Sequence, residues 1–173
     1  MKRISYVITL AAAFVAAGLI VPTAQAQGIC VDETTAGGWI PDGGDDVFAN
    51  FGLNAREEIR GENTELTGEL NFVDADMDCH VVGHEVLSYT EIDEFCREIV
   101  YDVTLSLFEV PQEGEFIAVV EVCDFGEPST DDTFSIEVFD VTDPENPVLI
   151  ETCSASGTLA GGNVQVREFG HCP

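Results

Sequence analysis

The chain has 173 residues, of which 33 are acidic and 6 are basic, so its formal net charge at neutral pH is −27. So large a negative charge repels nucleic acid and anionic lipid, and we expect neither as a partner. Hydrophobic residues make up 45% of the chain and alternate along much of it, which excludes a disordered acidic chain.

Residues 1–26 have the pattern of a secretory signal peptide. Residues 2–3 are basic, residues 4–21 are almost wholly apolar, and residues 24–26 read Ala-Gln-Ala, the small residues after which signal peptidase cleaves. A retained membrane anchor is the alternative for the same residues. Cleavage leaves residues 27–173, a length that suits one domain, in a secreted or periplasmic protein with no membrane segment.

The mature chain is more acidic still. Four arginines and no lysine remain against 33 acidic residues, a net charge of −29. A solvated surface suited to saline water is the main interpretation, because salt screens the self-repulsion, and multivalent cation binding is the alternative. Six cysteines in an exported chain predict three disulfides.

Residues 27–45, rich in Gly, Asp and Thr, predict a flexible leader that packs Trp39 onto the core. Residues 46–173 then predict a single β domain, because apolar residues recur there with a period of two between turn-rich breaks. A change of parity at Gly161-Gly162 predicts a β-bulge. The fold class is all-β: one antiparallel barrel or sandwich of about seven to eight disulfide-stabilised strands. The alternating stretches are 47–55, 66–72, 79–89, 99–107, 116–122, 134–138 and 159–166.

An up-and-down order of these strands predicts the disulfides. Only cysteines at the same end of the sheet can reach the ~5.5 Å Cα separation that a disulfide needs. Cys96 and Cys123 then fall at one end, Cys79 and Cys153 at the other, and Cys30 and Cys172 outside the strands near the two termini. The predicted bonds join Cys96 with Cys123, Cys79 with Cys153, and Cys30 with Cys172.

Several short segments, in this order, resemble the post-COAP domain, a family of small exported bacterial β domains. The resemblance spans about residues 47–167 and implies no established activity; such domains occur alone or appended to larger exported proteins. This chain departs from the family in its six cysteines, its acidity and a longer insert at 141–153. The segments are NA at 54–55, GELNFVD at 68–74, HV at 80–81, DFGEP at 124–128, DTFSI at 132–136 and ASGTLAGGNVQV at 155–166.

The first candidate calcium site is the run Asp74, Asp76 and Asp78. Counted from Asp74, the acids occupy positions 1, 3 and 5, and Glu85 occupies position 12, which is the spacing of an EF-hand loop. Position 6 is Cys79 instead of glycine, however, and the flanks alternate as strands. A calcium-binding β-turn and an acidic hairpin turn are therefore both open.

The second candidate lies in CDFGEPSTDDTF, residues 123–134. Asp124, Glu127, Asp131 and Asp132 could give oxygens to calcium, which takes six to eight of them. The alternative is a hairpin turn, because the Gly-Glu-Pro at 126–128 supplies the backbone angles that a turn needs. The resemblance implies the turn.

Catalytic motifs are missing. The sequence has no G-x-S-x-G, H-E-x-x-H or phosphate loop. His80 and His84 are four residues apart on a predicted strand, about 13 Å, which is too far for both to bind one zinc ion. Two of the many carboxylates could still form a hydrolase acid pair.

These observations predict an exported, non-enzymatic β module for extracellular or periplasmic binding, adhesion or structure, without an obligatory cofactor. A surface polymer or another exported protein is the expected kind of partner. Two alternatives stay open: a calcium-dependent module that uses its acidic turns, and a small hydrolase with a carboxylate pair.

Overall fold

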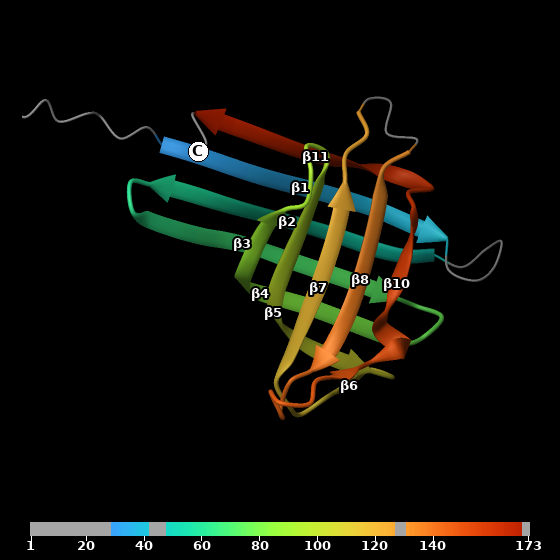
Figure 1. Cartoon of the computed structure of the whole chain (residues 1–173). Coiled ribbons are helices and arrows are strands. Elements are labelled where there is room, and N and C mark those ends of the chain that lie inside the picture. The colour runs from blue at the N-terminus through green and yellow to red at the C-terminus, as the bar shows by residue number, and fades with distance from the viewer. Residues whose placement is uncertain (1–28, 42–47, 127–130, 171–173) are drawn as a thin grey trace, which may run out of the picture.

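The computed structural model describes residues 29–41, 48–126 and 131–170, and it is an all-β, antiparallel fold (Figure 1). Within these residues no helix has the length and apolar character to cross a membrane. A single 3₁₀ turn, η1 (Glu151–Cys153), interrupts the strands. The strands are β1 (Ile29–Pro41), β2 (Phe48–Arg60), β3 (Asn63–Asp74), β4 (Cys79–Glu91), β5 (Cys96–Leu107), β6 (Val110–Pro111), β7 (Phe116–Cys123), β8 (Thr133–Asp140), β9 (Val148–Leu149), β10 (Ala155–Thr158) and β11 (Gly161–Gly170).

Two sequence predictions need correction. The flexible leader is wrong over residues 29–41, which form β1 and pair with β2 on one side and β11 on the other; residues 27–28 and 42–45 lie outside the described part. The described residues form eleven strands, more than the predicted seven to eight. The additional strands are β1, the two-residue β6 and β9, and the four-residue β10, all in segments whose Gly, Pro, Asp or Thr content is typical of loops.

The sheet is curled so that its two ends lie close together. The order of paired strands is β10-β8-β7-β5-β4-β3-β2-β1-β11. Strands β10 and β11 stand at opposite ends of this order, yet only residues 159–160 separate them in the chain. The backbone N–H of Leu159 donates to the carbonyl of Asp132 at 2.9 Å, and that of Ala160 donates to the carbonyl of Trp39 at 2.9 Å. We call this junction, where the two ends of the curled sheet meet, the seam.

The curl produces two crossed layers. In Figure 1, β7, β8 and β10 run across β1, β2 and β3. Strands β4 and β5 belong to both layers: β3 pairs only with residues 79–83 of β4, whereas β7 pairs with residues 96–103 of β5. The turn between the layers coincides with two irregularities of register in β4, between Gly83 and Glu85 and between Val86 and Ser88. Such bulges bend a strand pair locally.

Aromatic side chains join the two layers in the core. The ring of Phe51 on β2 stacks on that of Phe134 on β8, with centroids 3.8 Å apart, and Phe72 on β3 lies 6.1 Å from the same ring. All three are buried, together with the inward-facing Val, Ile and Leu residues of β3, β5, β7 and β8. Burial of each large side chain stabilises the fold by about 1.5–3 kcal/mol.

Two of the three predicted disulfides are confirmed. Cys96 and Cys123 are direct partners across β5 and β7, with Cα atoms 4.2 Å apart. Cys79 at the start of β4 bonds Cys153 in η1, with Cα atoms 5.6 Å apart. Cys30 is also disulfide-bonded; Cys172, its predicted partner, lies outside the described residues.

A buried polar network fastens the β4–β5 hairpin to β1 and β11. Arg97 on β5, 1% exposed, donates through Nε to Asp32 Oδ2 on β1 at 2.7 Å and through Nη2 to Glu168 Oε1 on β11 at 3.2 Å. The hydroxyl of Tyr89 donates to Asp32 Oδ1 at 2.8 Å and lies 2.7 Å from Thr34 Oγ1. Burial lowers the pKa of Arg97, but the hydrogen bond and charge of Asp32 more than offset this and raise that pKa.

Removal of this arginine should be costly. Arg97→Met leaves Asp32 buried with an uncompensated charge, and we expect a loss of about 3–5 kcal/mol in the free energy of unfolding, measured by urea denaturation. The matched control is Arg56→Met: the side chain of Arg56 is 44% exposed and Glu58 keeps Arg60 as a second partner, so the loss should stay below about 1 kcal/mol. Addition of Asp32→Asn to Arg97→Met should restore part of the stability. Equal losses in the two single variants would contradict the role given to Arg97.

Candidate functional site

Asp132 is a structural residue that closes the seam. It is fully buried, and its two carboxylate oxygens accept different backbone N–H groups. Oδ1 accepts from Phe125 at 3.0 Å and Oδ2 accepts from Val164 on β11 at 3.0 Å. This carboxylate thus accepts a backbone N–H of β11 that the carbonyl of a neighbouring strand would otherwise accept.

Asp124 has the same arrangement. Its Oδ1 accepts from the N–H of Gly126 at 2.9 Å, which stabilises the turn, and its Oδ2 accepts from the N–H of Val166 at 3.1 Å. Asp131 is exposed, and Glu127 lies outside the described residues. Backbone N–H groups thus engage both oxygens of Asp124 and of Asp132, which gives these two residues a structural role, and calcium binding by this group stays a prediction. From the connection between β7 and β8, Asp124 and Asp132 therefore hold β11.

The other acidic run forms the turn between β3 and β4. Asp74 is buried, and its Oδ1 accepts from the N–H groups of Asp76 and Met77, both at 3.0 Å. Asp76 and Asp78 are exposed, and Asp78 has a φ of 51°, in the left-handed region used by turns. This turn lies at the Leu107 end of β5 and the β7–β8 connection at the Cys96 end, so the structure does not bring the two predicted calcium groups together.

Neither histidines nor cysteines form a metal site in the described residues. His80 Nε2 lies 2.9 Å from Asn71 Oδ1, and His84 Nε2 lies 3.1 Å from Thr104 Oγ1, so each has its own partner on the outer face of the sheet. Cys96, Cys123 and Glu121 lie within 4.8 Å of one another, but the two sulfurs are joined in a disulfide.

Asp32 and Glu57 are the carboxylate pair that comes nearest to the hydrolase alternative. They are direct partners across β1 and β2. Burial and the charge of Asp32 raise the pKa of Glu57. However, Tyr89 and Arg97 occupy both oxygens of Asp32, and neither carboxyl group lines the grooves described below. Asp32 thus belongs to the buried network, and Glu57 is its neighbour across the β1–β2 pair.

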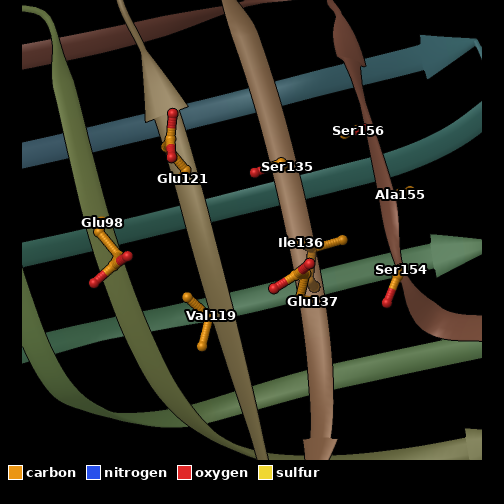
Figure 2. A pocket seen from close by; sticks show the side chains of 9 residues that line it. All are labelled: Glu98, Val119, Glu121, Ser135, Ile136, Glu137, Ser154, Ala155 and Ser156. Carbon is orange, nitrogen blue, oxygen red and sulfur yellow. The ribbon is translucent and has the colours of Figure 1, made fainter. Parts of the chain in front are cut away.

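Figure 2 shows the outer face of β5, β7, β8 and β10, which holds an acidic trough of about 620 Å³. We define the trough by Glu98, Glu121 and Glu137. Glu98 and Glu121 are direct cross-strand partners, a like-charge arrangement that is unfavourable without counterions. None of the four arginines of the described residues faces it: Arg97 points inward and the other three lie on β2 and β11. Its lining also includes serines at positions 135, 154 and 156 and apolar residues at 119, 136 and 155.

The outer face of β11, β1, β2, β3 and β4 holds a second and very different groove, which we call the amide groove. It consists of two hollows of about 590 and 320 Å³ that share Ala36 and Leu53. Its floor is low because Gly37 and Gly52 are direct partners across β1 and β2. The outward side chains that line it are Thr35, Asn54, Glu69, Asn71, Val82, His84, Asn163 and Gln165.

Trp39, the single tryptophan of the chain, flanks this groove. It lies two residues beyond Gly37 on the outward side of β1 and is 39% exposed. Its ring covers Gly161 on β11, where a Cβ atom would be 2.2 Å from the indole. The register pairs Trp39 with Gly161 and Gly38 with Gly162 without interruption, so the predicted β-bulge is wrong. The glycines instead permit close approach of β11 to β1 and its tryptophan.

Sequence reasoning missed the amide groove because its residues come from five strands, one of them assigned to the leader. A signal was present nonetheless. In a chain with 33 acidic residues, the outward positions 50, 52, 54, 71, 163 and 165 hold Asn, Gly or Gln. Uncharged outward positions on successive strands indicate a face that differs from the solvated remainder.

No family model, curated protein or solved structure matches this chain. The resemblance to the post-COAP domain therefore stays a prediction, and function must be argued from the geometry.

The role of Asp132 can be tested by substitution. Asp132→Ala leaves the N–H groups of Phe125 and Val164 without an acceptor, and we expect a loss of about 2 kcal/mol or more in the free energy of unfolding. Amide hydrogen exchange at Val164 should accelerate. Asp131→Ala, next to it but exposed, should cost less than about 0.5 kcal/mol. Equal effects of the two variants in urea denaturation would rule out the seam bonds.

Glu57 should make stability depend on pH. Its raised pKa means that the folded state binds its proton more tightly than the unfolded state, so folding stability falls as pH rises from the ordinary value of 4.5 through the raised pKa. Glu57→Gln removes this pH dependence, because glutamine does not titrate. The variant should therefore melt at a higher temperature than the wild type at pH 7, and this difference should shrink as the pH falls toward 4.5. A difference that is constant between pH 4 and 7 would show that Glu57 is not the titrating group.

Proposed function

We propose that the chain is an exported, non-enzymatic binding module, and that the amide groove is where it holds an extended surface polymer or another exported protein. The observation that carries the proposal is the contrast between the two outer faces. One face bears three glutamates and three serines, whereas the other bears four amides, a hydroxyl, a histidine, a valine and a single glutamate over a floor of glycines. Grooves with convergent polar groups are the usual place for a ligand.

The shape of the amide groove favours an extended ligand. The groove crosses five strands, and neighbouring strands are about 4.8 Å apart, so it is about 19 Å long across the sheet. Its lining residues follow the register in parallel rows, for example Gln165, Thr35 and Asn54 across β11, β1 and β2. A repeating polymer can use such rows repeatedly, whereas a small metabolite would use only part of them.

Binding is favoured over catalysis by the state of the carboxylates. The most buried ones, Asp32, Asp74 and Asp132, are engaged by hydrogen bonds that hold strands and turns. Glu69, the acid of the amide groove, is exposed. The disulfides fit an oxidising extracellular or periplasmic compartment.

Gly52→Leu should separate binding from folding. A Cβ atom at Gly52 meets nothing within 4 Å, so leucine fits without a clash while its side chain fills the groove. We expect unchanged or slightly higher stability, by about 0.5–1 kcal/mol, since glycine weakens a strand interior. Binding to cells and extracellular matrix of the producing organism should weaken about tenfold, measured by co-sedimentation of the mature protein.

Ser135→Leu is the matched control, because it places the same bulk on the outer face of β8 in the acidic trough. It should leave co-sedimentation unchanged. The mature chain has no lysine, so an amine-reactive dye labels only its N-terminus and leaves both faces unmodified. If the Ser135 variant lost binding and the Gly52 variant kept it, the acidic trough would be the binding face and the proposal would be wrong.

A further inference from the structure

We propose that the ligand of the amide groove is a neutral polysaccharide whose sugar rings stack on Trp39. This inference rests on the proposed function and names the chemical class of its ligand. Three features of the described residues carry it: the lining of the groove, in which Glu69 is the one acid among amides, the position of the tryptophan, and an amide oxygen without a partner.

The lining matches hydroxyl groups better than charges. An amide side chain offers donors and an acceptor together, as does each sugar hydroxyl, so Asn54, Asn71 and Gln165 can pair with hydroxyls in either direction. A polyanion would approach a chain with a mature net charge of −29. A polycation would find the stronger field on the opposite layer, at Glu98 and Glu121 of the acidic trough. With Glu69 as its one acid and no arginine in its lining, the amide groove offers little charge of either sign to hold a charged polymer.

Trp39 supplies an apolar surface beside these polar groups. One side of its ring lies on Gly161, and the residue remains 39% exposed on the same outward side as Gly37 and Asn163. The faces of a pyranose ring present C–H groups while its edge presents hydroxyls. A sugar unit placed on the indole would therefore pack its C–H face on Trp39 and turn its hydroxyls toward the amides.

Asn163 shows that the hydrogen bonding of the groove is incomplete. Its Oδ1 is buried and has no hydrogen-bond partner among the described residues. A buried acceptor without a donor costs about 1–3 kcal/mol. Asn163 also lines the smaller hollow of the groove, so a ligand in this hollow lies next to its side chain. A neutral polymer that donates here recovers that cost, which favours hydroxyl-rich ligands.

The single tryptophan makes the test direct, because all indole emission of the mature protein comes from Trp39. The oxidised mature protein is titrated with laminarin, mixed-linkage β-glucan, galactomannan, xyloglucan and dextran, and separately with alginate and chitosan oligomers. Binding is followed by Trp39 fluorescence and by affinity gel electrophoresis. We expect at least one neutral polymer to produce a saturable blue shift and gel retardation. Alginate and chitosan should not bind in the groove and should therefore produce neither effect by that route.

Variants test whether the polymer binds in the amide groove. Trp39→Ala and Gly52→Leu should each weaken retardation by that neutral polymer about tenfold, Trp39→Phe should restore part of it, and Ser135→Leu should have no effect. Melting temperatures show whether Trp39→Ala is still folded, and Gly52→Leu provides the same test without loss of packing.

The two proposals fail in different ways. Binding of alginate or chitosan that Gly52→Leu abolishes would overturn the neutral class and leave the binding groove intact. Neutral-polymer binding that is insensitive to Trp39→Ala and Gly52→Leu would overturn the groove itself. If no neutral polymer binds while cells still capture the protein in a Gly52-dependent manner, the inference falls and the proposed function stands.

Discussion

The structure depends on how the two ends of a curled sheet are held together where no strand pairs them. Strands β10 and β11 are joined by two residues, so the ends must meet, yet β11 pairs with β1 alone. Asp132 and Asp124 supply acceptors for the N–H groups of Val164 and Val166 on its open edge. An open edge would otherwise attract other strands, and buried carboxylates are one way to protect it. Arg97 makes a second connection from β5 to β1 and β11.

This constraint divides the acidic residues into two populations. A few, such as Asp32 and Asp132, are buried with every oxygen engaged. The others face solvent, where their mutual repulsion is relieved only by screening. The arginines are divided similarly: Arg97 holds the interior, and the other three lie on β2 and β11, strands that do not contribute to the acidic trough. The chain therefore has two chemically distinct outer faces although its net charge is strongly negative.

Local patterns in the sequence predict the meander from β2 to β8, because the apolar residues that alternate along β5 and β7 are the buried ones in the structure. The order of strands in this meander in turn predicts the bonds of Cys96 with Cys123 and of Cys79 with Cys153. Three features escape such reasoning. Strand β1 has a loop-like composition and exists because β2 and β11 provide partners on both sides. The inward face of β4 is ambiguous in the sequence because two irregularities shift its parity near Gly83 and Val86. The bonds of Asp132 to β11 join residues 32 positions apart, which no local pattern shows.

The glycines of the β11–β1–β2 face fall into two groups, those that the packing of the strands requires and one that it does not require. A Cβ atom at Gly38 would lie 2.2 Å from the carbonyl oxygen of Gly161, and Gly162 has a φ of 111°, so close approach of β11 to β1 accounts for these residues. Gly52 is different. It lies in the interior of a central strand, its φ is ordinary, and a side chain there would meet nothing within 4 Å. Glycine at such a position lowers stability by about 0.5–1 kcal/mol and gains no contact in return. Open space above Gly52 is thus a feature that the fold does not need, and the ligand that we propose for the amide groove would give a physical reason for keeping it.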